Sequence, residues 1–195
     1  MSLVPTLTRR EKTAMRITFC AQRLAVQQGY DHFTLDELAQ QAGVSRRTLF
    51  NYFPGKLDAV LGARPGLPQD ATETFLSGGP HGELLGDLGE LVCALLTVWG
   101  PLTREQWTTM RDCLITNPRV FKAAIERFDD IAKTMTGLVE ERSGLPRDQA
   151  CVALSVIKGV FGSALDQFVE RPDDRSLDTI VRDHLQVARD LLSIR

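Results

Sequence analysis

The segment from Gly43 to Lys56 carries side chains suited to contacts with nucleic-acid bases. Arg46 and Arg47 bear guanidinium groups that can donate two hydrogen bonds to guanine, and the amide of Asn51 can bond adenine in the same bidentate way. No acidic residue lies within this segment. Cations in the first turn of a helix oppose its dipole, so a helix gains nothing by itself from two arginines there. The segment therefore has the chemistry of a surface for an anionic partner.

Two short helices joined by a glycine turn are expected to position these side chains. Thr34 can cap the first helix and form a capping box with Glu37, and Gly43 should end that helix. Ser45 can cap the second helix, which is predicted over residues 46–52. DNA-binding proteins use such a helix-turn-helix to place its second helix in the major groove.

Helical periodicity predicts which side chains of the second helix face outward. Val44, Leu49 and Phe53 share the face that packs on the neighbouring helices. The outward set is polar or basic and consists of Arg47, Thr48, Asn51 and Tyr52. A solvated basic face on a plain three-helix packing unit is the alternative interpretation.

The chain of 195 residues is predicted to be all-α, because helical spacing recurs throughout and no alternating β-branched run occurs. An N-terminal three-helix domain is expected at 1–62, with a disordered tail at 1–8. A linker region rich in proline and glycine follows at 63–82, with a short helix near 70–76 left open, and a helical domain follows at 83–195. The helices expected beyond residue 82 are 83–99, 103–115, 118–142, 146–169 and 176–194.

Charge and composition narrow the function classes. The formal net charge is −2, yet residues 1–62 carry +3 and the remainder −5, which places the attraction for an anionic partner in the first domain. No apolar run has membrane-spanning length and no signal peptide is recognised, so a cytoplasmic protein without membrane contact is expected. Four separated cysteines and three scattered histidines provide no metal site, and no motif for a cofactor or for catalysis is present. An enzyme is not predicted.

Residues 33–56 resemble the DNA-binding domain of the tetracycline-repressor (TetR) family, without a gap, in the sequence FTLDELAQQAGVSRRTLFNYFPGK. The resemblance covers about a third of the chain, and the rest agrees in architecture only. It implies a homodimeric transcriptional regulator, usually a repressor, that reads a palindromic operator in double-stranded DNA. It also implies that the larger domain serves dimerisation and binds a small apolar or amphipathic effector.

Carried over by position, the resemblance assigns roles within the helix-turn-helix. Arg46, Arg47, Thr48 and Asn51 would face base edges, while Thr34, Tyr52 and Lys56 would hold phosphates. Phe50 stands where many members have tyrosine, and a thymine contact and a core position are both open for it.

Two sets of residues in the larger domain are further candidates. Large rings and thioethers that could line an effector pocket, or belong to ordinary core, are Trp99, Trp107, Met110, Phe121, Phe128, Met135 and Phe161. The last two predicted helices are apolar on more than one face, which favours a four-helix interface with a symmetry mate. The interface candidates are Val156, Gly159, Val160, Gly162, Leu185 and Leu192.

Two other functions are compatible with these features. One is an activator or a ligand-independent regulator on the same scaffold. The other is a helical protein-interaction module that no longer binds DNA, and Arg46, Arg47 and Lys56 argue against it because such a module has no need of that basic set.

Overall fold

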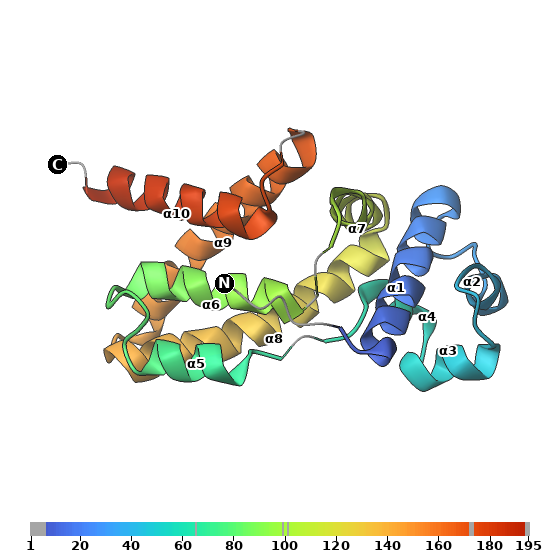
Figure 1. The fold of residues 1–195 in the computed structure, drawn as a ribbon, viewed down its shortest axis with the longest axis horizontal. Helices are drawn as coiled ribbons and strands as arrows, with labels where there is room; N and C mark the ends of the chain where they lie inside the picture. The colour runs from blue at the N-terminus through green and yellow to red at the C-terminus, as the bar shows by residue number, and fades with distance from the viewer. Residues whose placement is uncertain (1–6, 65, 99, 101, 172–173, 194–195) are drawn as a thin grey trace. The chain divides into compact units, whose positions relative to one another are not determined.

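The computed structural model describes residues 7–64, 66–98, 100, 102–171 and 174–193, and their regular structure is helical (Figure 1). No strand occurs among these residues, so the all-α prediction is confirmed. The helices are α1 (Arg9–Gln28), α2 (Leu35–Gln41), α3 (Arg46–Tyr52), α4 (Lys56–Leu61), α5 (Gln69–Leu76), α6 (Leu84–Val98), α7 (Arg104–Thr116), α8 (Pro118–Ser143), α9 (Arg147–Glu170) and α10 (Leu177–Ser193).

Side-chain caps set several helix starts where the sequence predicted them. Thr34 with Glu37 and Thr103 with Gln106 each form a complete capping box, and Ser45 accepts a hydrogen bond from the backbone N–H of Thr48. Thr8, which the sequence assigned to a disordered tail, forms one more capping box with Glu11 at the start of α1. The rest of that predicted tail, residues 1–6, lies outside the described residues.

The chain divides into two compact units whose bounds differ from the predicted domains. Unit 1 contains the described residues up to 64 and those of 102–128, and unit 2 contains those of 66–100 and 129–193. Residues 102–128, expected in the C-terminal domain, therefore pack with α1–α4, and the expected linker at 63–82 contributes α5 to unit 2. The helix α8 passes from one unit into the other.

Unit 1 is built around a core that α1 shares with the helix-turn-helix. Ile17, Leu24, Leu38 and Leu49 are completely buried in it, and Cys113 of α7 and Val120 of α8 join the same cluster. The burial of a cysteine and a valine from so late in the chain explains why α7 and the start of α8 belong to this unit.

Asn117, between α7 and α8, makes the polar connection within this core. Its side-chain oxygen accepts a hydrogen bond from the backbone N–H of Tyr30 at 2.8 Å, and its amide group donates to the carbonyls of Cys113 (2.9 Å) and Ala25 (3.4 Å). With 6% of its surface exposed, Asn117 has little contact with water. One side chain thus joins the end of α1, the loop before α2, and the α7–α8 junction.

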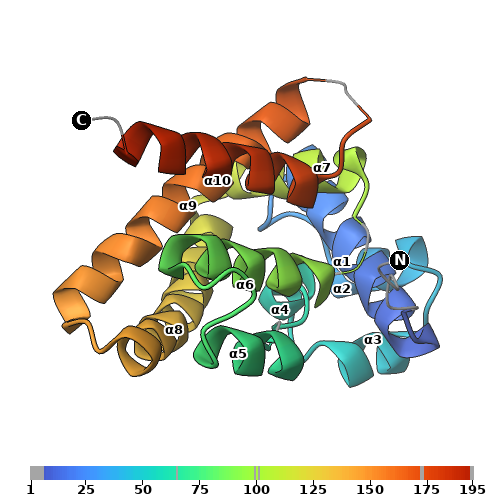
Figure 2. The same ribbon diagram turned by 60° about the vertical axis from the view of Figure 1, so that its left-hand side comes forward.

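Unit 2 packs α10 against α9 and α6, and α5 against α6 (Figures 1 and 2). The approach of α10 to α6 depends on Gly89, since a Cβ atom there would lie 2.2 Å from Cδ2 of Leu185. A buried ion pair between Asp87 of α6 and Arg142 of α8 adds a charged connection, and Asp87 also accepts a hydrogen bond from the backbone N–H of His81 at 2.6 Å. These hydrogen bonds to the carboxylate hold the pKa of Asp87 below its usual value, although burial opposes them.

Replacing Asn117 should weaken unit 1. We expect Asn117→Ala to lower the free energy of unfolding by about 2 kcal/mol, because it leaves the buried N–H of Tyr30 without its partner and removes the amide donor from the carbonyls of Cys113 and Ala25. Chemical denaturation followed by circular dichroism would measure this change. Ile115→Ala, two positions away at a side chain that is 71% exposed, is the matched control and should change stability by less than about 0.5 kcal/mol. Equal effects of the two substitutions would contradict the assigned role of Asn117.

Candidate nucleic-acid interface

The turn between α2 and α3 fixes how α3 is presented. Gly43 has φ of +61°, a backbone conformation that side-chain-bearing residues rarely adopt, and the N–H of Val44 donates to the carbonyl of Ala39 at 3.0 Å. Leu49 and Phe53 are buried on the inner side of α3. The burial of these two residues orients the short helix α3, which has seven residues, so that its opposite side faces outward.

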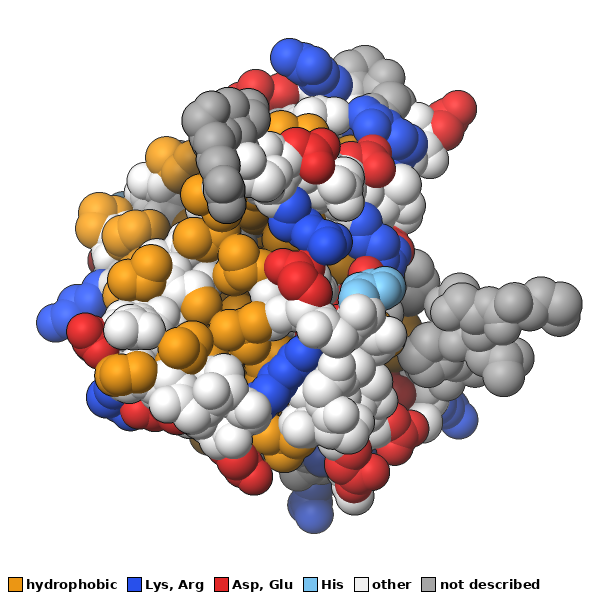
Figure 3. Space-filling model, turned by 90° about the vertical axis from the view of Figure 1, so that its left-hand side faces the viewer, with side chains coloured by type: hydrophobic (Ala, Val, Ile, Leu, Met, Phe, Trp, Pro, Cys, Tyr) orange, Lys and Arg blue, Asp and Glu red, His pale blue; other side chains and the backbone are white. Residues whose placement is uncertain are grey.

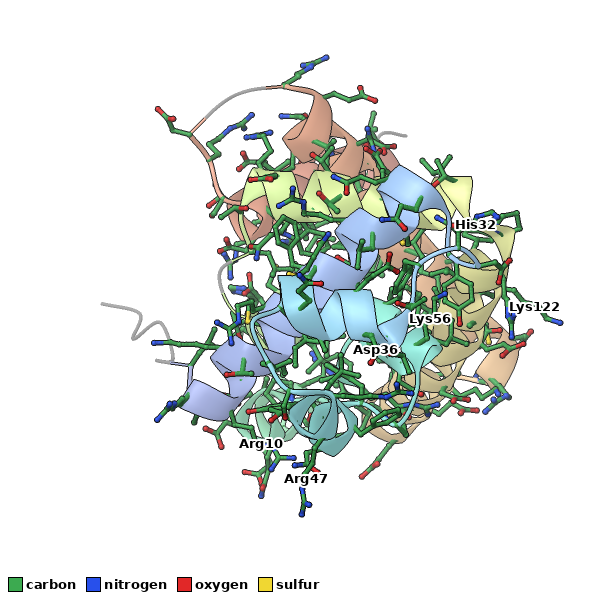
Figure 4. All side chains as sticks on the ribbon, turned by 90° about the vertical axis from the view of Figure 1, so that its right-hand side faces the viewer. Arg10, His32, Asp36, Arg47, Lys56 and Lys122 are labelled. Carbon is green, nitrogen blue, oxygen red and sulfur yellow. The ribbon has the colours of Figure 1, made fainter. Side chains whose placement is uncertain are left out.

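Three side chains form the open face of α3. Arg47 and Asn51 are exposed, four positions apart, and neither has a polar partner among the described residues. Phe50 is 43% exposed, so it is not a core residue, and its ring is available for an apolar contact such as a thymine methyl group. Arg47 extends outward from α3 in Figure 4. A guanidinium, an amide and a ring are the side chains expected for contacts with base edges.

The other two predicted base contacts already have partners within the domain. One guanidinium nitrogen of Arg46 lies 3.0 and 2.9 Å from the two carboxylate oxygens of Asp36 in α2, and its guanidinium lies 5.8 Å from the centre of the Phe50 ring. Both members of this ion pair are exposed, so it adds little to stability. The hydroxyl of Thr48 lies 2.8 Å from that of Ser45, within the cap of α3.

The structure adds Arg10 to this surface, a residue that the sequence analysis did not select. Its guanidinium lies 5.5 Å from the ring centre of Tyr52, so the first turn of α1 meets the last turn of α3. Arg10 and Arg47 lie at the same end of the domain (Figure 4). The cations in the first turn of α1 could have indicated such a contact, but only the fold brings them to α3.

Lys56 is directed into the domain. Its ammonium donates a hydrogen bond to the carbonyl of Phe33 and lies 4.1 Å from the Phe33 ring centre and 5.0 Å from that of Tyr30. Burial in this aromatic setting lowers the pKa of Lys56, against the opposing effects of Asp31 and Glu37. The side chain thus ties the start of α4 to the residue before Thr34. Its predicted phosphate contact remains a prediction, and it would have to compete with these partners.

Thr34 is likewise engaged at the start of α2. Its hydroxyl and backbone N–H both bond the carboxylate of Glu37, at 2.9 and 2.6 Å. These hydrogen bonds lower the pKa of Glu37. Thr34 is exposed, so it lies at the surface where a phosphate contact was predicted, with its hydroxyl already used in the cap.

The predicted effector residues are divided between the two units. Trp107, Met110, Phe121 and Phe128 lie in unit 1, Met135 and Phe161 lie in unit 2, and Trp99 lies outside the described residues. Trp107 and Met135 are buried, and Phe121 and Phe128 are exposed. A hollow of about 190 Å³ in unit 2 is lined by none of them; its lining residues are Asp70, Ala71, Thr74, Pro80, Asp87, Glu90 and Leu91.

The predicted interface residues also separate into two groups. Val160 and Leu185 are buried within unit 2, so their side chains are already covered by the chain itself. Leu192 is 66% exposed, and Gly159 and Gly162 of α9 have open space where a Cβ atom would stand. Three further large apolar residues of α9 and α10 are exposed and were not among the predicted interface residues: Val152, Val187 and Leu191.

Comparison with known proteins identifies this domain. Residues 20–61 match the family model described as bacterial regulatory proteins, tetR family, and this range contains α2, α3, α4 and the C-terminal part of α1. Residues 20–61 are therefore a DNA-binding domain of the tetR type. A chain with this domain is a DNA-binding transcriptional regulator and not an enzyme.

Solved structures resemble this chain in fold over nearly its full length. NalD of Pseudomonas aeruginosa, the secondary repressor of the MexAB-OprM multidrug efflux pump, shares 21% identity over 92% of this chain and 95% of its own, with a TM-score of 0.55. A transcriptional regulator of Aquifex aeolicus VF5 shares 15% identity over 92% and 99%, with a TM-score of 0.51. At these identities the likeness concerns the fold. Curated protein sequences provide no match.

Two substitutions in the TetR-family domain should separate DNA contact from domain stability. We expect Arg47→Ala to weaken binding to the preferred duplex by about 1–3 kcal/mol and to relax specificity at one base position, with thermal stability unchanged, because its side chain is exposed and unpaired.

Lys56→Met should have the opposite pattern, with a loss of about 1 kcal/mol in stability because the carbonyl of Phe33 loses its partner. The affinity of this variant for DNA should depend on salt as strongly as that of the parent. Thermal melts and fluorescence anisotropy titrations at several salt concentrations would measure both quantities. A salt slope lower by about 1 in Lys56→Met, with unchanged stability, would instead support a phosphate contact.

Proposed function

We propose that this chain is a ligand-responsive repressor that binds a palindromic operator as a homodimer. The observation that carries the proposal is the open face of α3, where Arg47 and Asn51 are exposed and unpaired beside Phe50. Two such faces related by a two-fold axis would meet two half-sites of inverted orientation, which is the symmetry of a palindrome.

The homodimer is supported by the uncovered apolar surface of α9 and α10. By length and mean hydropathy, α9 is the single described helix that is apolar enough to cross a membrane. Only 28% of its most apolar 18-residue stretch is buried, so most of that stretch is uncovered. Val152 is 64% exposed, and Val156 and Gly159 follow it at helical spacing on one stripe. On α10, Val187 and Leu191 are exposed four positions apart. Figure 3, which faces unit 2, shows hydrophobic side chains gathered on the surface of that unit.

A second copy of the chain accounts for this surface better than a membrane does. A DNA-binding regulator acts in the cytoplasm, and an isologous interface buries the same apolar stripe on both partners. The open positions at Gly159 and Gly162 would let a partner helix approach closely. The proposed interface consists of exposed residues of α9 and α10, with Val152, Val187 and Leu191 beside the earlier candidates Gly159, Gly162 and Leu192 and without the buried Val160 and Leu185.

The effector is proposed to be a small apolar or amphipathic molecule bound in the larger helical domain. Met135 and Phe161 are the candidates that lie in unit 2, and their flexible thioether and ring suit an adaptable apolar cavity. Repression, rather than activation, follows the usual action of the family that the sequence resembles.

In-vitro selection from random duplexes tests the proposed function. The purified parent should enrich a palindrome, and an Arg47→Ala/Asn51→Ala variant should not, because the enriched bases are contacted from α3. A reporter placed behind the enriched sequence should be silenced by the parent. Enrichment of unrelated sequences by both proteins, or activation of the reporter, would contradict the proposal.

The dimer can be tested by substitution on its proposed face. We expect the parent to be a dimer by light scattering at micromolar concentration, and Val152→Glu/Leu191→Glu to be a monomer, because the two carboxylates would have to lose water against an apolar partner. Ile115→Glu, at an equally exposed apolar residue of α7, is the control and should remain dimeric. A monomeric parent would contradict the interface.

A further inference from the structure

A stripe of cations on α1 lies apart from the face of α3. Lys12, Arg16 and Arg23 are exposed and follow one another at helical spacing, with Arg9 at the start of the same stripe. At roughly 100° per residue, their side of the helix lies about a third of a turn around from the buried positions Ile17, Ala21 and Leu24. We name these four residues the α1 stripe: Arg9, Lys12, Arg16 and Arg23.

The α1 stripe is unusual in this chain because it has no acidic partners. Among the described residues, none of its four members forms an ion pair. Elsewhere most arginines do pair with a carboxylate, as Arg127 does with Asp58, Arg147 with Glu140, and Arg182 with Glu90 and Asp178.

One contact and one electrostatic effect show how Arg16 and Arg23 of the stripe are arranged. The guanidinium of Arg23 lies 5.9 Å from the ring centre of Phe19, so it lies along the helix surface. The charges of Arg16 and Arg23 both act on the thiol of Cys20, which lies between them, and oppose the rise that burial causes in its pKa. The two guanidinium groups thus share one side of α1 and reinforce each other's field.

Like charges on one helix face cost stability, and a stripe of this kind has no use in packing. Such a stripe can instead bind a row of phosphates, because cations without intramolecular partners contribute most to the affinity for a polyanion. From Arg9 to Arg23 the stripe extends about 21 Å along the helix, a length of roughly six base pairs.

The position of α1 decides which phosphates could lie along it. The contact between Arg10 and Tyr52 puts the first turn of α1 beside the end of α3. A duplex seated on the open face of α3 would therefore pass close to Arg9 and Lys12. Arg16 and Arg23 are one and three further turns along the helix, so they are reached only by DNA that continues beyond the segment contacted by α3.

We propose that the α1 stripe binds the phosphate backbone of duplex DNA flanking the half-site read by α3. The proposal rests on the proposed function and deepens it, because it assigns part of the affinity to DNA outside the operator. The flank of the same duplex is favoured over a second duplex, since it is held close by the operator contact and needs no second encounter. Any bend required of the flank is offset by the added phosphate contacts.

The test compares the parent with Arg16→Ala/Arg23→Ala on two duplexes. One duplex has about 20 base pairs, enough for two half-sites one helical turn apart, and the other has the same centre within about 40 base pairs. Both duplexes carry a fluorescein label and have at their centre the palindrome enriched by in-vitro selection, and anisotropy is measured from low to moderate salt. Lys122→Ala/Lys133→Ala on α8 removes the same charge from exposed positions and is the control.

We expect the double variant to bind the short duplex within twofold of the parent. On the long duplex it should lose about tenfold in affinity, and its salt slope should fall by about 2, because two phosphates are no longer neutralised. The control should lose no length-dependent affinity. Thermal melts of all three proteins should coincide, because the substituted side chains are exposed.

Other outcomes separate the stripe from the proposed function. Equal losses on both duplexes, or the same loss in the control, would overturn the flank contact while leaving DNA binding by α3 intact. Binding of a second short duplex by the parent but not by the variant would assign the stripe to a separate duplex and also overturn it. A parent that binds neither duplex would contradict DNA binding itself, and the stripe with it.

Discussion

Unit 1 depends on the buried amide of Asn117. A side chain with both a donor and an acceptor can satisfy an N–H and carbonyls at once, and here it does so for the loop before α2 and for the ends of α1 and α7. The interaction joins residues about ninety positions apart, so a helix-turn-helix that could be a separate small domain is instead packed against α7 and the first turns of α8. The orientation of the DNA-facing surface therefore depends on a residue remote from it in sequence.

Contacts around Tyr30 connect the same part of unit 1 further. The ring of Tyr30 lies between two cations, with the ammonium of Lys56 at 5.0 Å and the guanidinium of Arg119 at 5.4 Å from its centre. Lys56 then bonds the carbonyl of Phe33, directly before the cap of α2. Further along α8, Arg127 donates to the carbonyl of Gly62 at 2.7 Å and to Asp58 at 2.9 Å, which holds both ends of α4's last turn. Since α8 continues into unit 2, both units contain part of this helix.

The sequence was sufficient for the local features and insufficient for the distant ones. The capping boxes at Thr34 and Thr103, the turn at Gly43 and the inward position of Leu49 follow from residues within one or two helical turns, and they were predicted correctly. The inward direction of Lys56 and the contact of Arg10 with Tyr52 depend on elements brought together by folding, which periodicity does not encode. The same holds for α7, whose place in unit 1 follows from Cys113, Val120 and Asn117 rather than from any local pattern.

Charge pairing connects these observations. Where an arginine of this chain holds two elements together, as Arg127 and Arg142 do, a carboxylate lies within hydrogen-bond distance, because a cation of low exposure needs a partner to offset its lost hydration. Within the part of the chain that the structure describes, Arg47 and the α1 stripe have no such partner, and their exposure makes this tolerable in the free protein. Exposed cations without a carboxylate partner thus mark the places where an anion from outside the chain can bind. With the proposed flank contact along α1, the DNA-facing surface would be larger than the helix-turn-helix alone.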